Sequence, residues 1–471
     1  MKIILWFSIL VWVVSGLYTI TSIDSPFGWA FETSLYLFAL FTAVLVLWLA
    51  RFLFYRQGLF ARLLSIVPFI LSLLLAFIST VCIIDYRILL PKITETSPKT
   101  WNQDYDFLKS KLYTHPAFKD SLTQSFLEEP RPDFEKLSDD ESLVALMRMI
   151  GKFPDGHTFI HPLQPAIKSQ FFPLVGYWFD DGYYIVRASD EYKFLEGKKL
   201  LQINNTPLEE ILSKINSLTG PENQWQGQSQ FDLFIFSANV LHGLGVIENA
   251  KSCTIQYQEN GVVKGTKIDS QSFINWFYWA LRPIDSDQVS PALMNLRKPN
   301  FQIRYDDTSR SVFLTFNLIQ NDRKSSIATL EKTLESLLQK QPEKIIIDLR
   351  NCGGGDNTLY NGIIETLRKN KGTIYVFVTR KTFSAAVNFI SELKMAFPIK
   401  LVGEPTGAGP NHYGDAEHYL STGAGISAFI STKSWIFDSL YRTNTYHPDI
   451  KINYQYEDFK NSNDPWMNSI K

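Results

Sequence analysis

The segment that most constrains the fold of this chain is a run of apolar residues followed by three glycines. Ile345–Leu349 holds one acid among four apolar residues, a composition typical of a parallel strand buried on both faces. Gly353–Gly355 follow, and glycine lets the backbone adopt a positive φ and approach a ligand closely. A second apolar strand, Thr373–Val378, leads through a short turn to Ser384, where a helical pattern begins. These residues predict an α/β sheet in which one strand ends at a glycine loop and another at a serine.

The serine and the glycine loop together indicate a nucleophilic site. A serine at a strand–turn–helix junction has an exposed hydroxyl at the positive end of the helix. Backbone N–H groups of Gly354 and Ala385 could bind the oxyanion that forms beside Ser384. The sequence therefore predicts a serine hydrolase with Ser384 as nucleophile. The alternative is a serine that only caps its own helix.

Four segments, in the same order as in a known family, resemble the tail-specific (C-terminal processing) serine proteases. They are Phe153–Thr158, which resembles the Asp-Gly-His-Thr element of the tricorn-like branch, IIIDLRNCGGG, SAAVNFISEL and LVGEPTG. The resemblance covers about residues 100–471. It implies a crotonase-like α/β spiral core, a peptide or unfolded protein as substrate, and no cofactor.

The resemblance also implies which residue is the base. The lysine that bacterial members use falls, by spacing, on Gly409, and no lysine lies between Lys400 and Lys433. Tricorn-like members use a histidine, which matches His157 here. A neutral imidazole can accept the Ser384 proton and return it to the leaving amine. The alternative is a turn histidine with a structural role.

The residue that orients the base is the next question. Tricorn-like members have a serine just before the histidine and a glutamate after the nucleophile, and Gly156 stands where that serine would be. Asp415, Glu417 and Asp438 are the acids in the corresponding part of the core. Of these, Asp438 is the preferred orienting acid.

Several other classes of function are disfavoured by the composition. The formal net charge is −1, so no basic surface indicates a nucleic-acid partner. His412, Asp415 and His418 lie close in sequence, but their spacing fits no zinc signature, so we expect no metal. Of the three cysteines, Cys253 and Cys352 lie in the region of the resemblance, and a disulfide between them stays open.

The first ninety residues carry three long stretches without a charged side chain. Each is near or above the about 18 residues that favour a membrane span. A cleavable signal peptide is the alternative for the first stretch. Arginines crowd the second loop, which predicts a multi-pass protein of the cell membrane with a cytoplasmic N-terminus and an extracytoplasmic catalytic part. The stretches are Ile3–Ile23, Thr33–Ala50 and Leu63–Ile84, and the arginines are Arg51, Arg56 and Arg62.

These patterns divide the chain into four expected parts. Residues 1–90 form a three-span membrane anchor, and residues 91–165 form a helical cap with the histidine element. Residues 166–300 form a β-rich insert, and residues 301–471 form the catalytic core. Within the insert, Gly197–Asn205 resembles part of a PDZ-like module, which would bind peptide at a sheet edge. The alternative is a β-rich unit that only packs on the core.

Two functions remain after this reading. The first is a membrane-anchored, extracytoplasmic serine-type endopeptidase that hydrolyses peptide bonds through Ser384 and His157. The alternative is a catalytically inactive member that binds peptides or an apolar ligand. The presence of both Ser384 and His157 favours the enzyme. The sequence leaves the oligomeric state open.

Overall fold

The structure is a computed structural model that describes most of the chain after residue 97. The chain divides into two compact units, Met1–Thr94 and Glu95–Lys471, and all described residues belong to the second. Because the second unit is one compact body, the internal boundaries expected at residues 165 and 300 stay predictions. The described residues are 98–119, 129–162, 164, 169–273, 275–276, 299–322, 325–421, 423–441 and 443–470.

One part of the predicted fold class needs correction. The prediction of a fold with three transmembrane helices is wrong for the part of the chain that the structure describes, where every helix is too short or too polar to cross a bilayer. The three apolar stretches between Ile3 and Ile84 lie outside the described residues. The fold class is therefore an α/β core with helical and β-rich additions.

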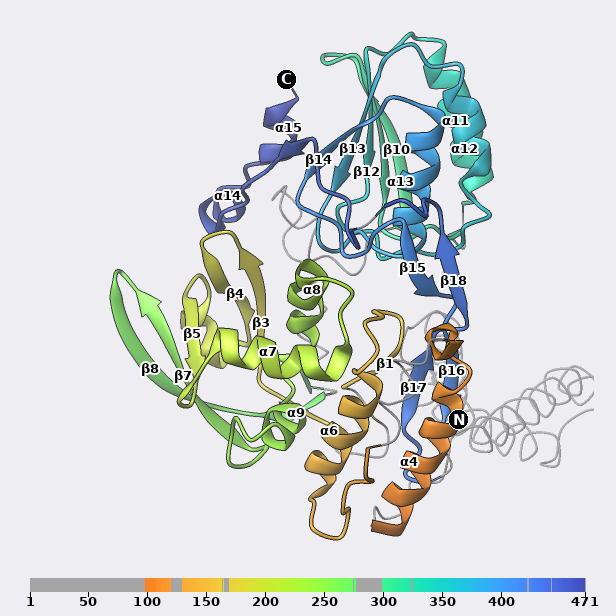
Figure 1. Ribbon diagram of the computed structural model, residues 1–471. Coiled ribbons are helices and arrows are strands. Elements are labelled where there is room, and N and C mark those ends of the chain that lie inside the picture. The colour runs from red at the N-terminus through yellow and green to blue at the C-terminus, as the bar shows by residue number, and fades with distance from the viewer. Residues whose placement is uncertain are drawn as a thin grey trace, which may run out of the picture. The chain divides into compact units, whose positions relative to one another are not determined.

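The core is a six-stranded, mostly parallel sheet (Figure 1). Ile345 pairs with Val312 on one neighbouring strand and with Ile374 on the other, so the apolar run of the sequence is a central strand as predicted. Only the first two strands pair antiparallel. In spatial order the strands are β10 (Phe301–Asp306), β11 (Ser311–Phe316), β12 (Lys344–Asp348), β13 (Thr373–Val378), β14 (Lys400–Gly403) and β19 (Ile450–Lys451).

Both faces of this sheet are covered. Ile345 and Ile347 pack with the helices α11 (Ile327–Leu338), α12 (Asn361–Leu367) and α13 (Ala385–Ala396), which lie along one face in Figure 1. Ile346 points to the other face, where it packs with aromatic residues that include Trp466. That face carries the short helices α14 (Tyr456–Lys460) and α15 (Pro465–Ser469). Burial on both faces is why β12 has no alternating pattern.

The helical cap leads directly into the histidine element. Helix α6 (Asp139–Ile150) begins at a capping box between Ser138 and Glu141. After the turn that contains His157, strand β1 (Phe159–Ile160) pairs with β17 (Ser427–Ile430), which also pairs with β16 (Glu417–Leu420). This pairing ties the histidine turn to the C-terminal part of the chain. The cap also contains α4 (Pro98–Leu112) and the short 3₁₀ helix η1 (Pro116–Lys119).

In its described residues the insert combines an antiparallel sheet with three α-helices. Its helix α8 begins at the side-chain cap of Asn223 and is rich in glutamine, so hydrophobic periodicity did not predict it. The strands of its main sheet are β3 (Leu174–Phe179), β4 (Gly182–Ala188), β5 (Lys199–Ile203), β6 (Thr206–Pro207), β7 (Ser252–Glu259) and β8 (Val262–Asp269). Its other elements are β2 (Gln170–Phe171), β9 (Gln271–Ser272), η3 (Asp190–Leu195), α7 (Leu208–Thr219), α8 (Gln224–Phe234) and α9 (Ala238–Gly243). A separate ribbon in the C-terminal part pairs β15 (Asn411–Gly414) with β18 (Lys433–Ile436).

Candidate active site

Ser384 stands at the junction between the turn after β13 and helix α13. Its backbone has φ 53° and ψ −129°, a conformation that L-residues with a side chain rarely adopt. Strained backbone of this kind persists where the surroundings fix it, and it clusters at functional sites. Ser384 occupies the N-cap position of α13, yet its side chain makes no capping hydrogen bond. The structure therefore favours the nucleophile over the helix-cap alternative.

The turn before Ser384 is tied to the loop after β12 by three hydrogen bonds. The Thr379 hydroxyl donates to the Arg350 carbonyl at 2.6 Å, and the Thr382 hydroxyl donates to the Leu349 carbonyl at 2.9 Å. The Phe383 N–H donates to the Cys352 carbonyl at 3.1 Å. Because β12 and β13 are adjacent and parallel, their carboxyl ends bring these two loops together.

Gly354 lies against Ser384, where the sequence predicted an oxyanion donor. A Cβ at this position would be 2.7 Å from Ser384 Cβ, 3.1 Å from Ser384 Oγ and 3.2 Å from the Ala385 nitrogen, and φ is +125°. Only glycine fits there. Ala385 is the first residue of α13, and the N–H of such a residue has no acceptor within its own helix. The structure thus brings Ser384, Gly354 and Ala385 together.

The glycine loop is anchored by a buried ion-pair cluster at the end of β12. The Arg350 guanidinium bonds the Asp348 carboxylate at 2.7 Å and the Asp464 carboxylate at 3.0 Å. The side chains of all three residues are largely buried. Such a cluster fixes the backbone that leads into the loop. Cys352, inside the loop, and Cys253, in β7, are both free thiols, so the open disulfide alternative is not realised.

His157 lies next to the nucleophile turn. Its ring stacks on Phe383, the residue before Ser384, with centroids 4.3 Å apart and an interplanar angle of 30°. The ring of His412 stacks nearby, with its centroid 5.9 Å from that of His157. Both ring nitrogens of His157 are buried and have no hydrogen-bond partner among the described residues. The ring therefore contacts the residue that precedes Ser384, and its nitrogens are without a hydrogen-bond partner in the described part of the chain.

The carboxylate beside this histidine is Asp155. Asp155 is fully buried and accepts hydrogen bonds from the backbone N–H of His157 at 2.9 Å, the Thr158 hydroxyl at 2.6 Å and His115 Nε2 at 2.9 Å. One of its oxygens lies 3.7 Å from His157 Nδ1. Burial opposes ionisation, but the interactions with His115 and His157 outweigh it and hold the pKa of Asp155 below its ordinary value of 3.8. Asp155 is therefore a fixed negative charge next to His157.

Asp438, the expected orienting acid, is placed elsewhere. Its side chain is exposed and accepts the Leu440 N–H at 3.0 Å, a bond within its own loop. Within the described residues it has no contact with His157. The other two candidates also have local partners: Asp415 pairs with Lys433, and Glu417 accepts the Tyr419 hydroxyl. Asp155 was missed because its carboxylate was read only as part of a motif.

The histidines of the C-terminal part are held by other partners. His412 Nδ1 lies 3.0 Å from the Gly409 carbonyl, and burial together with His157 lowers the pKa of His412 to about 4. His412 is therefore a neutral ring behind His157. His418 Nε2 bonds the Ser427 hydroxyl at 2.7 Å. These contacts give the two histidines hydrogen-bonding roles.

A second buried acid near His157 comes from the insert. Glu222 lies in the loop between α7 and α8 and is 7% exposed. One oxygen each of Glu222 and Asp155 and one ring nitrogen of His157 lie within 4.8 Å of one another, a spacing that a metal ion could bridge. However, the Asp155 oxygens already accept three hydrogen bonds. We therefore treat the three residues as a cluster of neighbouring polar side chains rather than as a metal site.

The fold formed by this sheet, its glycine loop and its junction serine is that of the tail-specific serine proteases. No protein-family model and no curated protein sequence matches this chain. The crystal structure of mature CPAF is similar, with a TM-score of 0.54 and 13% identity over 77% of this chain and 94% of that chain.

Two further solved structures of the same type are more distant. The photosystem II D1 C-terminal processing protease gives a TM-score of 0.38 and 11% identity over 76% of this chain and 94% of its own. The tricorn protease gives a TM-score of 0.32 and 13% identity over 79% of this chain and 35% of its own. The similarity to mature CPAF is a similarity of fold, and the resemblance to the tail-specific proteases is confirmed at the level of the fold.

Proposed function

We propose that this protein is a serine-type endopeptidase in which Ser384 is the nucleophile and His157 is the general base. The observation that carries the proposal is the strained Ser384, which makes no capping bond and lies against Gly354. His157 supports it, because the ring stacks on Phe383 and keeps both nitrogens free of hydrogen bonds within the described part of the chain. The proposed substrates are peptides or unfolded protein segments.

In the proposed reaction, Ser384 Oγ attacks the carbonyl carbon of the scissile peptide bond and gives its proton to a ring nitrogen of His157. The N–H groups of Gly354 and Ala385 stabilise the oxyanion of the tetrahedral intermediate. The protonated His157 then donates its proton to the leaving amine, and the C–N bond breaks. A water molecule attacks the acyl–enzyme through the same steps and releases Ser384.

The alternative function is a catalytically inactive protein that binds peptides or an apolar ligand. The backbone of Ser384 argues against it, because a strained serine costs folding free energy that a binding protein has no reason to retain. Gly354 argues the same way, since its place against Ser384 serves an oxyanion and excludes every other residue type.

The test is labelling of the purified protein with a fluorophosphonate, followed by mass spectrometry. We expect one adduct on Ser384, and we expect Ser384→Ala to lose both the adduct and peptide cleavage while its melting temperature stays nearly unchanged. Labelling that persists in Ser384→Ala would exclude Ser384 as the nucleophile. Absence of labelling and cleavage in the folded wild-type protein would favour the binding function.

The location of the catalytic part stays a prediction of the sequence. It rests on the basic residues of the first ninety positions, which lie outside the described residues. Asn205 is exposed on a turn of the insert, so a cysteine placed there is a suitable probe. An extracytoplasmic location predicts that this cysteine reacts with an impermeant maleimide in intact cells. Reaction only after lysis would place the catalytic part in the cytoplasm.

A further inference from the structure

We propose that Glu222, supplied by the insert, is a positioning residue that holds the His157 ring for proton transfer from Ser384. The inference rests on the proposed function, since it names a residue that acts on the proposed base. One carboxyl oxygen of Glu222 lies within 4.8 Å of a His157 ring nitrogen and of an Asp155 oxygen. No motif in the sequence marks Glu222.

Three polar side-chain atoms of this pair have no hydrogen-bond partner among the described residues. Glu222 Oε1 and both ring nitrogens of His157 are buried and make no hydrogen bond among the described residues. Buried polar atoms are nearly always hydrogen-bonded, and an unpaired one at a functional site indicates a bond that forms during the reaction. One Glu222 carboxyl oxygen lies within 4.8 Å of a His157 ring nitrogen, so the two groups are neighbours that are not hydrogen-bonded to each other. The Glu222 carboxyl and the His157 ring can therefore each provide the hydrogen-bond partner that the other lacks.

The residue before His157 makes room for this arrangement. A Cβ on Gly156 would lie 1.5 Å from Gln226 Nε2, so the Gln226 side chain fills the space that a side chain at 156 would need. Gln226 Oε1 in turn accepts the Glu222 N–H at 2.6 Å. Gly156 is the position where the tricorn-like pattern has a serine. In this protein the Gln226 side chain fills the space beside His157 and positions Glu222.

The loop that carries Glu222 is fastened to the catalytic core. The Asn223 amide donates to the Gly407 carbonyl at 3.0 Å and to the Asn444 carbonyl at 2.6 Å. The Asn444 amide donates back to the Glu222 carbonyl. These bonds join residues that are far apart in sequence. They fix the backbone of Glu222 relative to the core.

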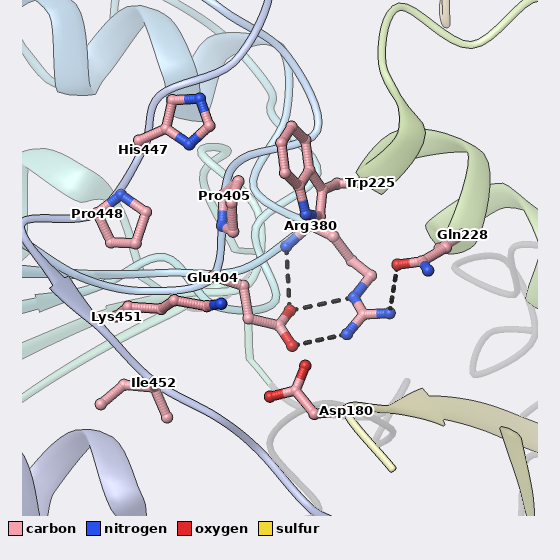
Figure 2. Close-up of a pocket in the computed structure, with 10 residues that line it drawn as sticks. All are labelled: Asp180, Trp225, Gln228, Arg380, Glu404, Pro405, His447, Pro448, Lys451 and Ile452. Carbon is pink, nitrogen blue, oxygen red and sulfur yellow. Dashed lines mark hydrogen bonds and ion pairs between the residues drawn. The ribbon is translucent and has the colours of Figure 1, made fainter. Parts of the chain in front are cut away.

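Helix α8 makes a second tie to the core one turn further on (Figure 2). Arg380 Nη1 donates to Gln228 Oε1 at 3.0 Å, while the same guanidinium pairs with Glu404 at 2.6 Å. Trp225 and Gln228 of α8 line one side of a hollow of about 340 Å³, and Arg380 and Glu404 line the other. The insert is therefore attached to the core at two places near Glu222. These attachments hold Glu222 in a constant position relative to His157.

The charges around the ring agree with this role. Burial first, and the negative Asp155 second, raise the pKa of Glu222 well above its ordinary 4.5. Asp155, Glu222 and His412 are the titratable groups that face His157, and His115 stands behind Asp155. When His157 takes the Ser384 proton, its positive charge lies beside two carboxyl groups. The positive ring favours loss of the Glu222 proton, and the carboxylate that forms stabilises the protonated ring.

The experiment measures the titration of His157 directly, by NMR of protein with ¹³C-labelled histidine, assigned with His157→Ala. Removing a carboxyl that pairs with the protonated ring should make the ring titrate at lower pH. We expect Glu222→Gln to lower the midpoint by at least about half a pH unit, and Glu222→Asp to restore part of the shift. The matched control is Asp232→Asn, another acid of the insert with a raised pKa, which interacts with Tyr183 and Lys381.

Kinetics on the same variants supply the second readout. Glu222→Gln should lower kcat about tenfold with KM within about twofold, and it should move the acid limb of the kcat profile with the NMR midpoint. Asp232→Asn should leave both unchanged. A His157 midpoint that stays in place in folded Glu222→Gln overturns the inference, whatever the activity. A midpoint that moves in a protein that fluorophosphonate fails to label supports the pairing and refutes the proposed peptidase.

Thermal unfolding shows whether the variant is folded and tests the burial of the acid. Because folding raises the pKa of Glu222, the folded state holds this proton more tightly, and its stability falls as pH rises above about 4.5. Glu222→Gln lacks this loss, so its melting temperature should gain on the wild type between pH 5 and pH 8. A pH-independent difference would contradict the proposed environment of Glu222.

Discussion

The two halves of the candidate active site are built in different ways. The nucleophile half comes from one stretch of chain, because Gly354 and Ser384 follow two strands that are adjacent in both sequence and sheet. The base half joins residues from the cap, the insert and the C-terminal ribbon, which are His115, Asp155, His157, Glu222 and His412. A short-range pattern can therefore encode the first half, whereas only the packing of distant segments builds the second.

The halves also differ in what holds them rigid. Backbone geometry fixes the nucleophile half, where Ser384 and Gly354 both adopt positive φ. Buried hydrogen bonds to one carboxylate, Asp155, fix the base half. The ring of His157 connects the two halves by stacking on Phe383. Substitutions in the two halves should consequently fail in different ways.

The largest effect should come from removing either reacting group. Ser384→Ala and His157→Ala should each lower kcat on the order of 10⁴-fold, because the proton transfer needs both residues. The double variant should lose little more, since a serine and its base act as one unit. Single-turnover assays with a fluorogenic peptide measure all three.

The outcome for His157→Ala decides whether the base half is catalytic. In the wild type, kcat/KM should rise with pH through one ionisation that this variant removes. If His157→Ala keeps more than about a tenth of the wild-type kcat, His157 has a structural role, and the proposed mechanism is wrong.

The next effect concerns the backbone of the nucleophile half. Gly354→Ala places a methyl group 2.7 Å from Ser384 Cβ at a φ of +125°, so it must displace the serine or the oxyanion donor. We expect kcat to fall about 10²–10³-fold. Gly353→Ala is the matched control, because a Cβ there meets nothing within 4 Å. Equal losses in the two variants would refute a specific role for Gly354.

Asp155→Asn should act on stability as well as rate. Its carboxylate is buried and hydrogen-bonded to His115 Nε2, so its loss should cost on the order of 3 kcal/mol of the free energy of unfolding. Folding lowers the pKa of Asp155, so its contribution is present above pH about 3.8 and is lost as pH falls below that value. The wild type should therefore lose stability steeply in acid, and Asp155→Asn should lose less. Urea unfolding at several pH values measures both, and parallel curves would contradict the prediction.

The smallest effect should come from Asp438→Asn. The carboxylate is exposed and bonds only the Leu440 N–H among the described residues, so we expect kcat to change by less than about twofold. The same assay on Asp155→Asn provides the contrast. A large loss in Asp438→Asn alone would return this residue to the role of orienting acid and remove Asp155 from it.

The sequence by itself determined the nucleophile half of the site. The apolar run of β12, the three glycines and the strand before Ser384 are local signals, because strand burial and positive φ depend on residue type at neighbouring positions. The resemblance to the tricorn-like branch also pointed to His157.

Only the tertiary structure decided which acids surround the base. Sequence order pointed to Asp438, but the fold turns this residue to solvent and brings Asp155 and Glu222 to His157. Glu222 depends on the docking of the insert through Asn223 and on the space left by Gly156. The physical reason is that the packing of several distant segments determines the position of a buried carboxyl. The residues next to it in sequence do not determine how those segments pack.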